Sequence, residues 1–114
     1  MSSEAIKFAQ QNHQLFLTEL KEFLKIPSIS ILDEYASDID VAADWLIQKL
    51  TDMNLPMVKK ISTERHPIVY AQNLSAGDNK PTILFYGHYD VQVPDPLSAW
   101  DSEPFTPTIR NNNL

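Results

Sequence analysis

The feature that most constrains the fold is a run of four apolar residues, 83–86, that ends at Gly87. A continuous apolar run of this length predicts a β-strand buried on both faces, and such strands belong to sheets covered by helices. His88 and Asp90 follow at a spacing of two, so an extended chain points both side chains to the same face. Ligands bind at the carboxyl ends of strands in open α/β sheets, which makes this pair the candidate functional site.

An imidazole and a carboxylate at this spacing fit one arrangement that is common in metal binding. Neutral histidine is a frequent zinc ligand, and a nearby carboxylate often accepts a hydrogen bond from its other ring N–H. His88 is therefore the candidate metal ligand, and Asp90 is the candidate catalytic-site residue that orients the imidazole. A histidine at a strand end can also bond only to backbone, and the H-x-D spacing by itself leaves this structural alternative open.

The other periodic segments also favour an α/β fold. Apolar residues at steps of three and four predict a helix over residues 4–25, which ends before Pro27. Residues 37–40 have the form of a capping box and predict the start of a second helix. Two short runs rich in β-branched residues, 57–61 and 67–74, predict a hairpin. We therefore expect a mixed sheet with helices packed on it.

Several side chains outside the H-x-D pair have simpler explanations than a functional one. The buried stripe of the second helix is expected to comprise Ile39, Ala42, Ala43, Leu46, Leu50 and Met53. His13 lies in the polar half of the first helix, and His66 lies in the predicted turn between the strands. We expect both of these histidines to be exposed to solvent.

Composition limits the classes of partner and of metal site. The 114 residues and 13.0 kDa fit one domain with one core. A formal charge of −6 argues against a nucleic-acid or anionic-membrane surface and favours a small-molecule partner. There is no cysteine, so a metal would be held by nitrogen and oxygen. Residues 1–14 lack the layout of a signal peptide, and no window approaches the roughly 20 apolar residues of a membrane span, so we expect a cytoplasmic protein.

The segment from residue 85 to the end of the chain resembles the first metal motif of a family of zinc-dependent peptidases and amidohydrolases. That family includes aminoacylase, glutamate carboxypeptidase and the cytosolic dipeptidases, and the dipeptidase and carnosinase branch is the most similar. The match runs through Gly87-His88-Tyr89-Asp90-Val91-Gln92, then Asp95-Pro96-Leu97, Trp100 and Ser102-Glu103-Pro104-Phe105. Residues 23–30, F-L-K-I-P-S-I-S, resemble the first helix of the family and its following turn.

The resemblance implies the amino-terminal part of a phosphorylase/hydrolase-like catalytic domain, with residues 1–114 as a single incomplete domain. It implies two zinc ions in the complete enzyme, with His88 as the first ligand and Asp90 as its partner. Activity would be cleavage of a peptide or amide bond, in a small peptide or acyl-amino acid, by a metal-activated water. The remaining site residues and a dimerisation domain that could form a homodimer would lie further along.

The function of these residues and the identity of the metal both stay open. Because one persuasive ligand is too few for a catalytic zinc site, these residues alone are expected to be inactive. The chain could instead be a truncated, non-catalytic α/β module that acts through binding or self-association. A site of histidine and carboxylate also suits manganese and cobalt, so the metal is not determined by the sequence.

Overall fold

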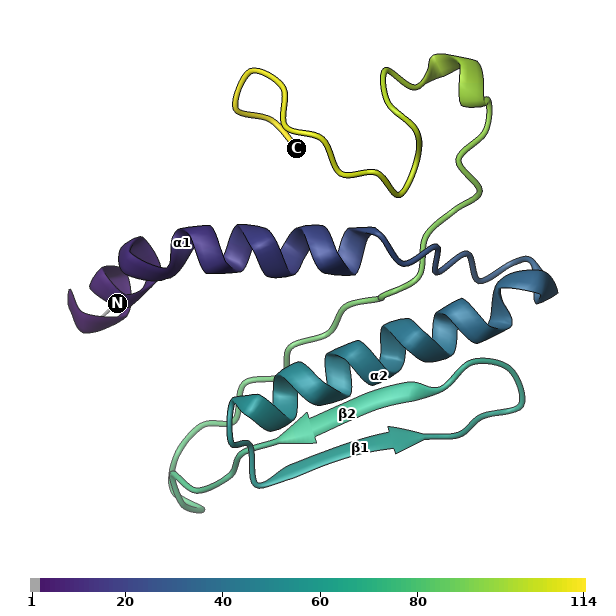
Figure 1. Ribbon diagram of the computed structural model, residues 1–114. Coiled ribbons are helices and arrows are strands. Elements are labelled where there is room, and N and C mark those ends of the chain that lie inside the picture. The colour runs from purple at the N-terminus through teal and green to yellow at the C-terminus, as the bar shows by residue number, and fades with distance from the viewer. Residues whose placement is uncertain (1–2) are drawn as a thin grey trace. The chain divides into compact units, whose positions relative to one another are not determined.

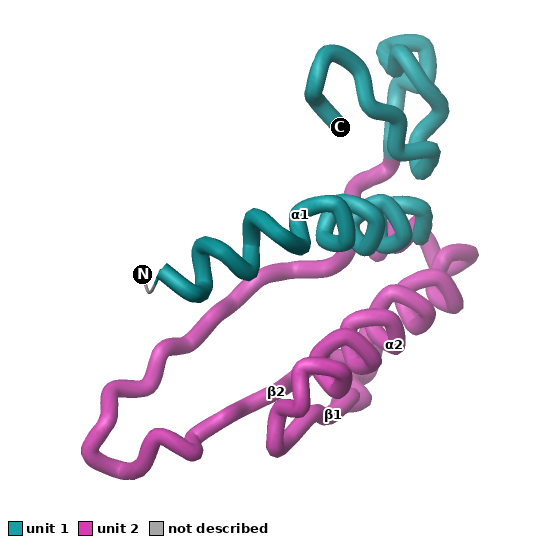
Figure 2. The backbone as a smooth tube through the Cα atoms, turned by 60° about the vertical axis from the view of Figure 1, so that its left-hand side comes forward, with its two compact units in different colours: residues 1–26, 94–114 teal, residues 27–93 magenta. Residues whose placement is uncertain are grey.

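The computed structural model describes residues 3–114. In chain order its elements are α1 (Ser3–Leu24), the 3-10 turn η1 (Asp33–Tyr35), α2 (Ala36–Asp52), β1 (Met57–Ile61), β2 (Ile68–Gln72) and the 3-10 turn η2 (Leu97–Ala99) (Figure 1). The chain divides into two compact units (Figure 2). One comprises the part of the chain up to Ile26 together with Pro94–Leu114, and the other comprises Pro27–Val93.

In the unit Pro27–Val93, α2 packs on a hairpin formed by β1 and β2 (Figure 1). The strands pair antiparallel, from Met57 opposite Gln72 to Ile61 opposite Ile68, which confirms the predicted hairpin. Three members of the predicted stripe of α2 are buried, namely Ile39, Ala42 and Ala43, whereas the predicted burial of Met53 is wrong, because this residue follows the end of the helix and is 68% exposed. The alanines have small side chains and so allow the helix backbone to approach the sheet closely. The α/β class and the packing of a helix on the sheet are confirmed.

The start of α2 differs from the predicted capping box. The helix begins at Ala36, the N-cap residue is Tyr35, and no side chain caps the helix. The reason is that η1 runs directly into α2, with the Ala36 N–H donating to the Asp33 carbonyl. Ser37 therefore lies inside the first turn of the helix, where it cannot act as the cap.

The buried strand predicted at residues 83–86 is wrong for the described part of the chain. These residues are extended without a ladder partner there, and their exposed fractions run from 74% to 93%. A strand is buried on both faces only when a sheet flanks it and helices cover it, and no such neighbours surround this segment in residues 3–114. The described sheet is accordingly antiparallel rather than mixed. A single parallel bridge, between Ile29 and Val91, lies outside it.

The other unit contains the long first helix, which was correctly predicted. Phe8 and Phe16 on α1 lie with ring centroids 6.0 Å apart, yet no described residue of α1 is buried. In the second segment of this unit, Arg110 donates through Nη2 to the Asp101 carbonyl at 2.9 Å. Within residues 3–114, no helix combines the length and apolar character that crossing a membrane requires.

Candidate metal-binding site

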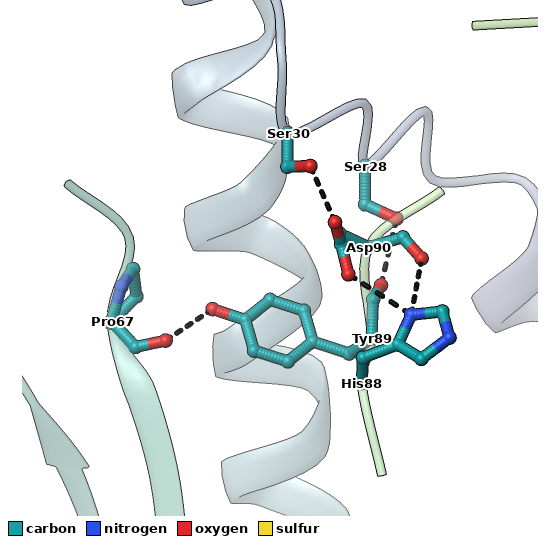
Figure 3. A network of polar contacts seen from close by, with 6 residues as sticks. All are labelled: Ser28, Ser30, Pro67, His88, Tyr89 and Asp90. Carbon is teal, nitrogen blue, oxygen red and sulfur yellow. Dashed lines mark hydrogen bonds and ion pairs between the residues drawn. The ribbon is translucent and has the colours of Figure 1, made fainter. Parts of the chain in front are cut away.

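The structure brings together the two residues that the H-x-D spacing singled out. His88 Nδ1 lies 3.0 Å from Asp90 Oδ1 and 3.0 Å from the Asp90 backbone oxygen (Figure 3). Both oxygens accept hydrogen bonds, so the proton of the neutral imidazole belongs on Nδ1. Nε2 then carries the lone pair, and no described residue bonds to it. The His88 side chain is 78% exposed, which leaves Nε2 accessible to a ligand.

The Asp90 carboxylate is held at both oxygens. Oδ1 faces the His88 ring, and Oδ2 accepts a hydrogen bond from Ser30 Oγ (Figure 3). The Ser30 hydrogen bond is the largest cause of a lowered pKa for Asp90, which burial partly opposes and the His88 contact reinforces. Asp90 is therefore an anion at neutral pH, able to accept the Nδ1 proton of His88.

The serine loop, residues 27–30, holds the backbone of the site. Ser28 Oγ donates to the Tyr89 carbonyl at 2.9 Å, and the Val91 N–H donates to the Ser28 carbonyl at 2.8 Å. Ser28 and Ile29 are both buried. These contacts join segments about 60 residues apart in the chain, so the backbone on both sides of Asp90 is fixed to the serine loop.

Two further side chains connect the site to the hairpin. His66 Nε2 lies 2.8 Å from the Ser30 carbonyl, and because a carbonyl only accepts, the ring donates. The Tyr89 hydroxyl donates to the Pro67 carbonyl, and burial raises the pKa of that hydroxyl (Figure 3). The expectation that His66 is exposed is wrong, since it is half-buried at this contact. His13 is exposed, as expected.

Sequence reasoning missed Ser28, Ser30, Tyr89 and His66 as contributors to the site. The segment I-P-S-I-S did contain a signal for a shared polar face. Alternation in an extended chain places Ser28 and Ser30 on one face and Ile29 on the opposite face. The partner of the serines could not be identified from the local pattern.

The donor set fits part of a metal site. His88 offers one nitrogen, with the ring orientation fixed by a carboxylate, as is usual for metal-bound histidine. Catalytic zinc sites have about three protein ligands. Residues 3–114 contain no group of three His, Asp or Glu side chains placed to hold one ion. The described residues therefore fit one candidate ligand, His88, and its orienting partner, Asp90.

Comparison with known proteins finds relatives of this chain, although no family model matches it. The chain is 31% identical over 100 residues to the succinyl-diaminopimelate desuccinylase of Pelagibacter ubique, a match that covers 86% of this chain and 24% of that protein. It is 29% identical over 105 residues to the Cys-Gly metallodipeptidase dug1 of Schizosaccharomyces pombe, covering 84% of this chain and 22% of that protein.

A solved structure agrees with these relatives. An M20 family metallo-carboxypeptidase from Sulfolobus solfataricus matches with a TM-score of 0.70 and 40% sequence identity, over 83% of this chain and 21% of that chain. The chain thus spans about a quarter or less of the length of the proteins it matches. It is related in sequence and in fold to the metallopeptidases of the M20 family, and it corresponds to their amino-terminal part.

Proposed function

We propose that the chain is the amino-terminal part of a metal-dependent hydrolase that cleaves peptide or amide bonds in small peptides or acyl-amino acids. In this proposal His88 binds one metal ion through Nε2. The observation that carries it is the contact of Nδ1 with Asp90 Oδ1, because this contact leaves an exposed Nε2 with its lone pair free. Two of the relatives carry metallopeptidase names, a dipeptidase and a carboxypeptidase, which supports the same chemistry.

The residues that surround His88 have defined parts in this proposal. Asp90 accepts the Nδ1 proton, which selects the tautomer and fixes the ring plane. The serine loop holds the backbone on either side of Asp90, so the imidazole is presented in one orientation. When bound, metal ions in such sites polarise a scissile carbonyl and lower the pKa of water.

The proposal includes zinc as the metal, with two ions in the complete enzyme, since nitrogen and carboxylate ligands suit zinc in a protein without cysteine. Residues 1–114 form one incomplete domain of a cytoplasmic enzyme in this account. They supply one ligand of about three, so they do not catalyse hydrolysis alone.

The direct test is a zinc titration of the 15N-labelled chain, followed through the ring nitrogens of its three histidines by long-range 1H–15N correlation. We expect the Nε2 signal of His88 to move at lower zinc concentrations than any signal of His13 or His66. His13→Ala is the matched control, because His13 is also exposed and should leave the titration unchanged. Zinc that moves His13 first, or a His88→Ala variant that titrates like the unsubstituted chain, would refute the assignment.

A second candidate function has one observation in its favour. The exposed apolar residues 83–86 suit a non-catalytic module that binds a partner or a second copy of itself. Sedimentation of the chain with and without zinc distinguishes the two. Self-association together with no zinc response at His88 would favour the module, whereas a zinc response at His88 favours the hydrolase.

A further inference from the structure

We infer that Ser30 is a positioning residue for the metal ligand: its hydroxyl fixes the Asp90 carboxylate and, through that carboxylate, the tautomer of His88. This inference deepens the proposed function and rests on it. It assigns a role in the metal site to the serine loop, a segment some 60 residues away in sequence.

The two carboxylate oxygens of Asp90 divide their contacts in a way that gives Ser30 this role, while the Asp90 backbone oxygen, 3.0 Å from His88 Nδ1, favours the same tautomer independently of Ser30. Oδ1 accepts from His88 Nδ1 at 3.0 Å, while Oδ2 accepts from Ser30 Oγ (Figure 3). A carboxylate bonded at one oxygen can still rotate about its Cβ–Cγ bond, because that torsion has broad minima. The Ser30 hydroxyl bonds the other oxygen and so resists this rotation. Oδ1 is thereby kept in front of Nδ1.

Ser30 is itself held in place from two directions. Its carbonyl accepts from His66 Nε2 at 2.8 Å, which ties it to the turn of the hairpin. Its neighbour Ile29 is buried and bridges to Val91, next to Asp90. The backbone that carries the Ser30 hydroxyl is therefore held by contacts on both sides. A group that orients another group must itself be fixed in this way.

The same loop supplies a matched control. Ser28 also makes one side-chain hydrogen bond to the segment, but it donates to the Tyr89 carbonyl and does not touch the Asp90 carboxylate. Ser28 is more buried than Ser30, so removing its hydroxyl disturbs the loop at least as much. A purely structural role of the loop would make both serines act on His88 alike. The inference requires that only Ser30 does so.

The experiment measures the tautomer of His88 in the 15N-labelled chain without metal, at a pH at which the 15N shifts themselves show the ring to be neutral. The unsubstituted chain should hold mostly the Nδ1–H form. Ser30→Ala should lower the ratio of Nδ1–H to Nε2–H by roughly 2- to 10-fold, the range set by one net hydrogen bond. Ser28→Ala should change it by less than about twofold, and Ser30→Thr, which keeps a hydroxyl, should restore most of it.

Ser30→Cys serves if Ser30→Ala does not fold, since a thiol is similar in size and a weaker donor. An unchanged tautomer ratio in folded Ser30→Ala, or in Ser30→Cys where that variant replaces it, would overturn the inference, and so would an equal shift in Ser28→Ala. These outcomes leave the proposed function intact as long as zinc still moves the Nε2 signal of His88 in the unsubstituted chain. An unsubstituted chain that holds His88 mostly as Nε2–H would overturn both.

Discussion

The stability of the chain should depend on pH through Asp90, and Asp90→Asn isolates this dependence. The folded-state pKa of Asp90 lies below the ordinary value of 3.8, with the Ser30 hydrogen bond as its first cause. A lowered folded-state pKa means that the unfolded chain binds the proton more readily. The stabilisation is therefore present above the unfolded pKa, and it is lost as pH falls through the folded pKa.

The magnitude follows from the contacts of the carboxylate. A hydrogen bond to a charged group contributes about 1.5–3 kcal/mol when it is well shielded from water. The Asp90 side chain is 39% exposed, so solvent screening reduces the expected contribution to about 1 kcal/mol. Asparagine has the same shape, and its NH2 group can donate to Ser30 Oγ because a hydroxyl also accepts, but both hydrogen bonds are then to a neutral group and lose the part of this energy that comes from the charge.

The assay is urea unfolding of the chain and of Asp90→Asn across a pH series. We expect the free energy of unfolding to differ by about 1 kcal/mol at neutral pH, and the difference to shrink below about pH 4. Repeating the pair in a His88→Ala background removes the contact between His88 and Asp90, so that the remaining pH dependence reports the Ser30 contact. In a Ser30→Ala background most of the pH-dependent difference should disappear. A difference that stays constant down to the lowest pH, or that grows as pH falls, would refute this reasoning.

Two other predictions concern packing and solubility. Ile39→Ala should lower the free energy of unfolding by about 2–5 kcal/mol, because Ile39 on α2 is only 1% exposed. Val41→Ala on the same helix, at a residue 53% exposed, should change it by less than about 0.5 kcal/mol, and equal effects in urea unfolding would contradict the orientation of α2. Phe85→Lys should reduce self-association in sedimentation equilibrium, because Phe85 lies in the exposed apolar run. A variant that associates as strongly as the unsubstituted chain would show that this run is not the contact.

Local patterns were sufficient for the parts of the fold that depend on local contacts. The three- and four-residue apolar steps predicted α1 to within a residue at each end, and β-branched runs predicted the hairpin. The contact of His88 with Asp90 follows from a spacing of two in an extended chain, so the sequence could predict it as well.

The rest depends on residues far apart in the sequence, which no local pattern encodes. An apolar run shows that residues 83–86 can be buried, but burial requires neighbours, and none surround the run in the described part of the chain. The bond between Ser30 and Asp90 joins positions 60 apart, and His66 reaches Ser30 across 36 residues. Ser37 does not cap α2, because the 3-10 turn η1 runs directly into the helix and places Ser37 inside its first turn.

The most direct test of the central claim is the hydrolysis rate of a chimaera. In this chimaera, residues of this chain replace the matching fifth of the Sulfolobus solfataricus metallo-carboxypeptidase. We expect a folded, metal-loaded protein that hydrolyses a peptide substrate of the parent enzyme. His88→Ala should abolish nearly all of this activity and part of the metal content, while His13→Ala should leave both unchanged. Hydrolysis that persists at the full rate in the His88→Ala chimaera would show that His88 is not a metal ligand of the active site.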